Sequence, residues 1–173
     1  MRKVIKWDYA GKNYRTKHYS AAHAVEILFA DGDTPPEEAL SLTEIQKSDG
    51  SWAALDTPQA INSLLIDEHN ITSPRGLLSI ALAKVSRINF DFLNDWKSVD
   101  MPRRFSSNVD SIQSDNISPL LGQLVSSGTA TLKELEEYYS LQDVFVMLDA
   151  LTVKAVNDCL THEEAEQAAR AAR

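Results

Sequence analysis

The stretch SPRGLLSIALAKVSRINFDF, residues 73–92, decides the fold class of this chain. Ser73 followed by Pro74 is typical of a helix start, because serine caps free backbone N–H groups and proline fits the first helical position. Apolar residues then recur at steps of three and four, which predicts an amphipathic helix with one face turned toward a core. The apolar positions are Leu77, Leu78, Ala81, Leu82, Val85, Ile88 and Phe92.

Toward the amino terminus, residues 4–19 predict a β-hairpin. The segments VIKWDY (4–9) and YRTKHY (14–19) alternate roughly between apolar and polar residues, and AGKN (10–13) between them supplies turn residues. An isolated hairpin is marginally stable in water, so we expect it to pack against the helix that follows. Ser20 can cap that helix, which we expect to run to Phe29 and to stop at residues 31–33.

Residues 31–58 are interrupted repeatedly by glycine and proline, at Gly32, Pro35, Pro36, Gly50 and Pro58. This punctuation predicts a long, mobile and acidic excursion with at most one short helix, over residues 37–45. A further helix should begin where proline follows a capping threonine at residues 57–58. Its apolar positions, Ala60, Ile61, Leu64 and Leu65, have helical spacing.

Beyond residue 95 the sequence is polar and aperiodic up to residue 118, which predicts a linker. Short helices are expected over residues 119–125 and 132–139, and Ser140 can cap a long helix that frays over residues 161–173. The long helix has a wide apolar stripe that something must cover. Its members are Val144, Phe145, Met147, Leu148, Leu151, Val153, Val156 and Leu160.

These patterns together predict a mainly α fold, in which a small N-terminal β-hairpin packs on a helical bundle and a C-terminal helical extension follows. We expect a hairpin and helical core domain over residues 1–95, a polar linker over 96–118 and a helical extension over 119–173. A chain of 173 residues is long enough for one medium domain or two small ones.

Charge is unevenly distributed along the chain, whose formal net charge is −8. Residues 1–20 hold six basic side chains against one acidic, a net +5, whereas residues 26–69 hold ten acidic against one basic, a net −9. The simpler interpretation is that the basic hairpin folds against acidic helices of its own chain; the other is a basic surface kept for a partner. The negative net charge of the whole chain disfavours binding to nucleic acid or to anionic membranes.

A single cysteine, Cys159, excludes an internal disulfide, and no long apolar run indicates a signal peptide or a membrane span. We therefore expect a cytoplasmic protein. Cys159 lies on the apolar side of its expected helix, where cysteine usually acts as a small inert hydrophobe. The glycines are dispersed and none precedes a Lys-Ser or Lys-Thr pair, which disfavours nucleotide hydrolysis.

The four histidines, His18, His23, His69 and His162, lack the spacing of paired zinc ligands. His18 and His23 flank a strand-to-helix corner, where they could meet. We interpret them as surface or partly packed residues. The Asp-Gly-Asp sequence at 31–33 resembles the start of a calcium loop, but the two prolines that follow favour a helix stop. We therefore predict no catalytic site, no metal site and no cofactor.

Three segments resemble tail assembly chaperones of tailed phages. The first is the run from Trp7 to Arg15, WDYAGKNYR, followed by Ser20-Ala21-Ala22. The second is Val85–Leu93, with the Asn-Phe-Asp-Phe sequence at 89–92. The third is YSLQDVF at residues 139–145, followed by MLDAL at 147–151.

The resemblance implies a non-enzymatic chaperone that binds the long helical tape measure protein and tail-tube subunits in the host cytoplasm and keeps them soluble until the tube polymerises. It also implies that the segment after about Trp96 is an extension, often added in that family by a programmed frameshift. An alternative is a connector or tail-end protein that stays in the phage particle.

A chaperone needs an apolar surface that grips its partner and enough net charge to keep the complex in solution. The two helical stripes are the candidate gripping surfaces, although apolar stripes more often simply form a core. Self-association stays open. The candidate partner-binding residues are Leu77, Leu78, Leu82, Val85, Phe92, Val144, Phe145, Leu148 and Leu151.

Overall fold

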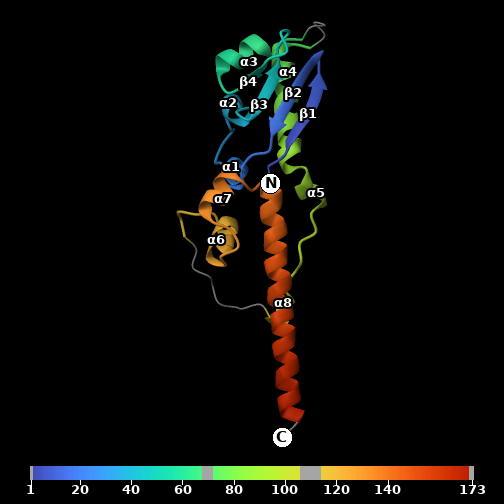
Figure 1. The fold of residues 1–173 in the computed structure, drawn as a ribbon, viewed down its shortest axis with the longest axis vertical. Coiled ribbons are helices and arrows are strands. Elements are labelled where there is room, and N and C mark those ends of the chain that lie inside the picture. The colour runs from blue at the N-terminus through green and yellow to red at the C-terminus, as the bar shows by residue number, and fades with distance from the viewer. Residues whose placement is uncertain (1, 68–71, 106–113, 172–173) are drawn as a thin grey trace.

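A computed structural model of the chain describes residues 2–67, 72–105 and 114–171. A four-stranded sheet and several shorter helices form a head, from which one long helix, α8 (Leu141–Ala171), projects (Figure 1). Most of the described regular structure is helical, so the predicted mainly α class is confirmed in outline. The shorter helices are α1 (Ala21–Leu28), α2 (Pro36–Ala39), α3 (Pro58–Leu64), α4 (Pro74–Phe90), α5 (Phe92–Asp95), α6 (Pro119–Ser126) and α7 (Leu132–Glu137), with a 3-10 turn η1 at Arg103–Phe105.

The sheet is antiparallel, with the order β1 (Val4–Tyr9), β2 (Lys12–Lys17), β3 (Thr43–Gln46) and β4 (Trp52–Ala54). Strands β1 and β2 form the predicted hairpin, and its turn residues Ala10 and Gly11 both have positive φ, at 50° and 77°. Positive φ at both central residues is typical of a type I′ turn, whose backbone twist matches that of the two strands it joins.

The expectation of a hairpin alone is wrong, because the hairpin is half of a larger sheet. In β2–β3 pairing, Tyr14 lies opposite Ile45 and Thr16 opposite Thr43. The predicted mobile excursion over residues 31–58 is therefore corrected too: it holds α2 and the β3–β4 pair. These strands span only four and three residues, so their sequence pattern is short. Pairing of β3 with β2 and of β4 with β3, rather than local propensity, stabilises them.

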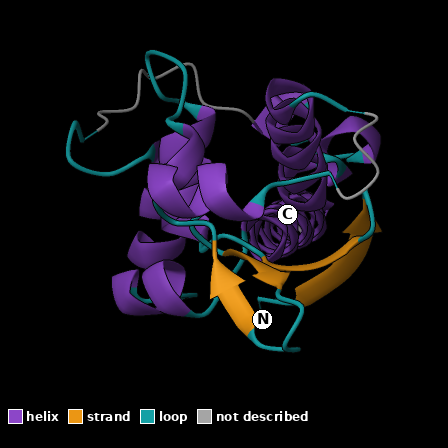
Figure 2. Cartoon of the chain, turned by 90° about the horizontal axis from the view of Figure 1, so that it is seen from above, coloured by secondary structure: helices purple, strands orange, loops and turns teal. Residues whose placement is uncertain are grey.

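One face of the sheet forms part of the core. Tyr14 is 2% exposed, and its ring stacks on that of Trp7 with centroids 4.1 Å apart. The indole N–H of Trp7 donates to Oγ1 of Thr16 at 3.0 Å, and this hydroxyl bonds with that of buried Thr43, also at 3.0 Å. Seen from above, the strands lie along one side of the head and most helices on the other (Figure 2).

The C-terminal helices pack on the N-terminal part of the chain. Helix α1 contacts both α7 and α8, and the backbone N–H of Ala21 donates to the carbonyl of Tyr139 at 2.8 Å. Arg2 adds a second connection, because its backbone N–H donates to the carbonyl of Tyr138 at 3.2 Å and its Nε to that of His18 at 2.8 Å. Helix α7 and the first turns of α8 thus pack on the N-terminal part of the chain, while the division of the chain into separately folding domains stays a prediction.

The first turns of α8 are anchored in the core, where Leu141 and Val144 are buried and the helix contacts α1 and α6. Residues 97–105 of the predicted linker then follow α8 away from the head (Figure 1). Two polar contacts join them: the N–H of Val99 donates to Oδ1 of Asp149 at 3.3 Å, and Arg104 pairs with Glu163 at 3.3 Å. No described helix combines the length and apolar character needed to cross a membrane.

Candidate partner-binding surface

The nine residues predicted to bind a partner lie on α4, α5 and α8, mostly within the packing of the head. Leu77, Val85 and Val144 are almost completely buried, with 2%, 1% and 0% of their surface exposed. A partner can therefore touch these three only if the fold opens. Six others are partly buried and pack against the core: Leu78, Leu82, Phe92, Phe145, Leu148 and Leu151. Partner binding by these six stays a prediction.

Two of the predicted residues are brought together from distant parts of the chain. Phe92 of α5 and Phe145 of α8 meet edge to face, with ring centroids 5.6 Å apart. Trp96 completes the cluster, since its ring lies 5.9 Å from Phe92 and 5.6 Å from Phe145. Edge-to-face pairs of this kind stabilise by about 0.5–1.5 kcal/mol beyond their area burial. The cluster therefore fastens the end of the α4–α5 segment to α8.

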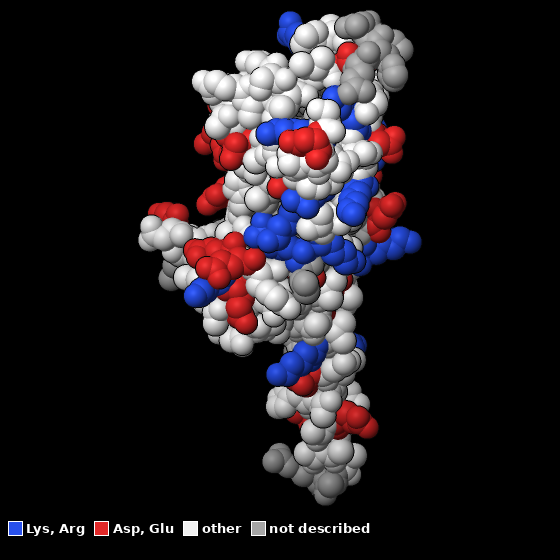
Figure 3. Space-filling model, turned by 45° about the horizontal axis from the view of Figure 1, so that its top comes forward, with Lys and Arg blue, Asp and Glu red and all other residues white. Residues whose placement is uncertain are grey.

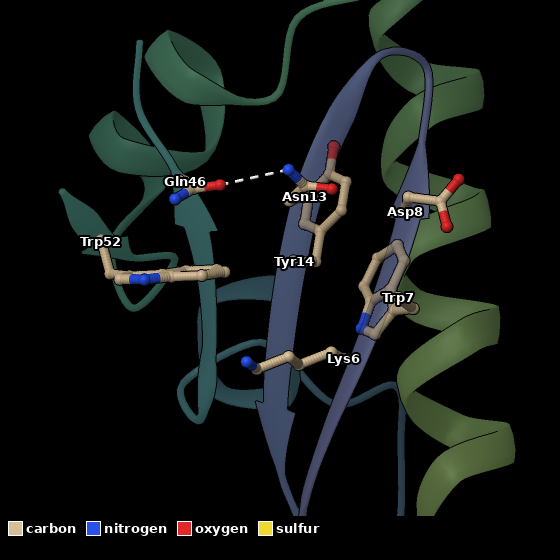
Figure 4. Close-up of a pocket in the computed structure, with 7 residues that line it drawn as sticks. All are labelled: Lys6, Trp7, Asp8, Asn13, Tyr14, Gln46 and Trp52. Carbon is tan, nitrogen blue, oxygen red and sulfur yellow. Dashed lines mark hydrogen bonds between the residues drawn. The ribbon is translucent and has the colours of Figure 1, made fainter. Parts of the chain in front are cut away.

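The outward face of the sheet is a second surface, which follows from the alternation of side chains along each strand. In this register Lys6 of β1 lies opposite Arg15 of β2, and Arg15 lies opposite Glu44 of β3. One step along, Nδ2 of Asn13 donates to Oε1 of Gln46 at 3.1 Å. Figure 4 shows these strands side by side, with the amine of Lys6 directed toward Trp52 of β4.

Trp52 and Arg15 are in contact on this outward face. The guanidinium carbon of Arg15 lies 4.5 Å from the centre of the Trp52 ring, within the range of a cation–π interaction. Arg15 also binds both carboxylate oxygens of Glu44, with Nη2 to Oε1 at 3.0 Å. The hydrogen bond from Arg15 lowers the pKa of the Glu44 carboxyl, and the same bond raises the pKa of Arg15. Glu44 thereby holds the Arg15 guanidinium next to the indole before any partner arrives.

A shallow hollow of about 350 Å³ opens on this face, lined by Lys6, Trp7, Asp8, Asn13, Tyr14, Gln46 and Trp52 (Figure 4). Its polar atoms come from an ammonium group, a carboxylate and two side-chain amides, which can hydrogen-bond to backbone or side-chain groups of another protein. These lining residues contain no nucleophile paired with a general base. The arrangement is thus suited to binding, with Trp52 as its apolar anchor.

Basic side chains gather in a band next to an acidic cluster on the face of the molecule that Figure 3 shows. Arg2 connects the N-terminal segment to the end of α7, because its Nη1 donates to the carbonyl of Glu137 at 3.2 Å. The expected attraction between the basic hairpin and the acidic segment that follows is realised by the Arg15–Glu44 pair, across two strands rather than against helices.

Among the described histidines, His18 and His23 are partly buried and His162 is exposed. Burial is the main cause that lowers the pKa of His18, with the charge of Lys3 second. His23 packs edge to face on Tyr19, with ring centroids 5.0 Å apart, and His162 is exposed on α8, 3.2 Å from Glu166. His69 lies outside the described residues. Over residues 2–67, 72–105 and 114–171, no three His, Cys, Asp or Glu side chains are grouped to hold a metal ion.

Sequence reasoning missed the outward face of the sheet because it treated residues 31–58 as mobile. A signal was nevertheless present, since Thr43-Glu44-Ile45-Gln46 alternates with period two and Gly50, at φ +82°, follows it in a turn. No protein-family model, no curated protein and no solved structure matches this chain.

Proposed function

We propose that this chain is a non-enzymatic tail assembly chaperone of a tailed phage, which binds tape measure and tail-tube proteins in the host cytoplasm and keeps them soluble during assembly. The observation that carries the proposal is the arrangement of Trp52, Arg15 and Glu44 on the outward face of the sheet. Trp and Arg are the residue types most enriched at the energetic centres of protein interfaces.

Preorganisation supports a binding role for this face. Trp52 is partly exposed, and Arg15 is held over it by Glu44, so little side-chain freedom remains to be lost when a partner docks. The surrounding amides and the charges of Lys6 and Asp8 supply a polar rim. Such a surface, an aromatic anchor within a polar rim, is typical of protein-binding sites.

One of the segments that resemble tail assembly chaperones contributes residues to the same surface. Its first segment, residues 7–15, forms most of the β1–β2 hairpin. That segment contributes Asp8, Asn13 and Arg15 to the outward face. The residues that suggest the family are therefore also residues that would meet a partner.

Co-expression with the tape measure protein of the same phage tests the proposal. We expect the wild-type chain to raise the soluble fraction of the tape measure protein, and Trp52→Ala to abolish most of that gain. Phe29→Ala is a matched control, because Phe29 is an aromatic residue with 63% exposure at the end of α1, away from the sheet. Equal solubility of the tape measure protein with and without this chain would exclude the function.

The second candidate is a structural protein that stays in the particle, which the 31-residue helix α8 favours because a long projecting helix suits a permanent assembly contact. Mass spectrometry of purified virions separates the two functions. A chaperone should be absent from the particle, whereas a connector or tail-end protein should be present at a fixed copy number.

A further inference from the structure

The free face of α8 has three large apolar side chains in a row. Val146, Val153 and Leu160 are 55%, 42% and 41% exposed, and they follow one another at intervals of seven residues. Ala150, Asn157 and Glu164 occur between and after them, all exposed, so that steps of four and three residues alternate from 146 to 164. This alternation is the spacing of the helix–helix seam of a coiled coil.

This stripe is distinct from the apolar face that the head covers. At about 100° per residue, Val146 and Val153 lie on nearly the opposite side of the helix from buried Val144 and partly buried Leu148. Segment 97–105 contacts α8 at Asp149 and Glu163, between these two faces. A repeat of seven residues drifts by about 20° per heptad on a straight helix, which a left-handed supercoil with a second helix corrects.

The outer half of α8 has little support from the rest of the chain. Residues 164–171 are all exposed, and the side-chain contacts described there are ion pairs of Glu166 with His162 and Arg170, at 3.2 and 3.4 Å. Exposed pairs of this kind stabilise a helix by only about 0.3–0.5 kcal/mol each. Since helices without tertiary packing are marginal in water, a partner helix along the stripe would stabilise this half.

We propose that this stripe binds the same stripe of a second copy of the chain, as a parallel two-stranded coiled coil. In register, the valines, the leucine and the alanine each meet their own counterpart. Asn157 falls at the position where a buried asparagine pairs with its counterpart and fixes both register and two-strandedness. Lys154 of one copy and Asp149 of the other flank the stripe at positions that face each other between the two helices, which favours a pair of opposite charge. Asp149 also accepts the N–H of Val99, so segment 97–105 borders this side of the seam.

An antiparallel pair fits these residues less well. In an antiparallel pair, a residue of the series 150, 157 and 164 faces a residue of the series 146, 153 and 160 of the second helix. Asn157 would therefore face a valine or leucine in every register that keeps the stripe together. A side-chain amide buried against an alkyl group loses its hydrogen bonds with water without replacing them. The sequence of the stripe therefore favours the parallel arrangement.

Light scattering and sedimentation of the full chain test the dimer. We expect a mass of twice 19.2 kDa at concentrations of tens of micromolar, and a mass of 19.2 kDa for the double variant Val153→Glu/Leu160→Glu. Both residues are exposed in the single chain, so the head should keep its near-ultraviolet circular dichroism. The far-ultraviolet helical signal should fall, because the outer half of α8 frays without its partner helix. His162→Glu is the control, because His162 is exposed on the side of α8 away from the stripe. A wild-type mass of 19.2 kDa, or of three or more copies, overturns the proposal.

Disulfide cross-linking tests the direction independently of stability. In a Cys159→Ser background, the parallel dimer predicts that Val146→Cys and Leu160→Cys each cross-link to the same residue of the other copy. Asp158→Cys, at an outward position of the supercoil, is the negative control and should cross-link at least tenfold more slowly. If cross-links form only in a mixture of Val146→Cys and Leu160→Cys chains, or equally at Asp158→Cys, the parallel arrangement is wrong.

Discussion

Asn89 of α4 is hydrogen-bonded to the backbone of Tyr19, at the corner where the sheet gives way to α1. The N–H of Tyr19 donates to Oδ1 of Asn89 at 2.8 Å, while Nδ2 of Asn89 donates to the carbonyl of Val85 at 2.9 Å. Asn89 is 5% exposed and Tyr19 is 2% exposed, so water cannot replace these bonds. One side chain thus ties the strand-to-helix corner to the longest helix of the head.

Replacing Asn89→Leu should destabilise the protein by about 1–3 kcal/mol, because the N–H of Tyr19 would be left buried without an acceptor. Urea unfolding followed by circular dichroism measures this as a lower midpoint with an unchanged slope. Asn94→Ala, at an exposed amide on α5, is the control and should change the free energy of unfolding by less than about 0.5 kcal/mol. Equal effects of both variants would contradict a structural role for the Asn89 amide.

Thr16→Val should also destabilise the protein by about 1–3 kcal/mol, since Oγ1 of Thr16 accepts the indole N–H of Trp7 at 3.0 Å. Thr16→Ser keeps the acceptor and should recover most of the loss. Near-ultraviolet circular dichroism reports whether the stacked rings of Trp7 and Tyr14 keep their environment. If the serine variant is as unstable as the valine variant, the lost methyl group rather than the hydrogen bond explains the result.

His18 should make stability depend on pH below about 6.5, the unfolded pKa of histidine. Burial lowers its folded pKa below the unfolded value of about 6.5, so the unfolded state binds more protons in the interval between the two values. The contribution of His18 to the free energy of unfolding is thus fully present above pH 6.5 and is lost as the pH falls through the folded pKa. Urea midpoints at several pH values should show a shallower decline for His18→Gln than for wild type, and equal declines would contradict the role of His18.

Phe92→Ala should loosen segment 97–105, because the aromatic cluster directly precedes it and the polar contacts of Val99 and Arg104 with α8 are exposed. Trypsin cleavage after Arg103 or Arg104 is then expected to accelerate about tenfold. This factor corresponds to a free energy of local opening that is lower by about 1.4 kcal/mol. The control is Leu132→Ala, which removes an exposed apolar side chain from α7. Equal cleavage rates in wild type and Phe92→Ala would show that the cluster does not restrain the segment.

Helix starts were predictable because their signals are local. Ser20, Thr57 and Ser73 each cap a helix as expected, through hydrogen bonds from N–H groups three residues on. Strands β3 and β4 were not predicted, because both are short. Strand β3 is stabilised mainly by β2, which lies about 30 positions earlier in the chain, and β4 depends in turn on β3.

The binding surface was harder to predict than the fold. An apolar stripe has the same spacing whether it faces a core or a partner, so Leu77 and Val144 were reasonable candidates that the structure places in the core. Trp52 could not be placed before β4 was known. For α8, periodicity alone merged the covered face and the free face into one wide stripe, and only the exposure of Val146 and Val153 separates them.

The hydrogen bond from Arg2 to the carbonyl of Glu137 joins groups 135 positions apart in the sequence, and it has a consequence for synthesis on the ribosome. The hairpin emerges well before α7. The carbonyl of Glu137, which accepts from Arg2, follows 135 positions later, and the carbonyl of Tyr139, which accepts from Ala21, follows shortly after it. Contacts between such distant segments form slowly, because a large loop must close before they can stabilise anything. Nascent chains that stop before α7 should therefore expose the apolar side of α1, and the final closure of the head should coincide with the release of α7 and the first turns of α8 from the exit tunnel.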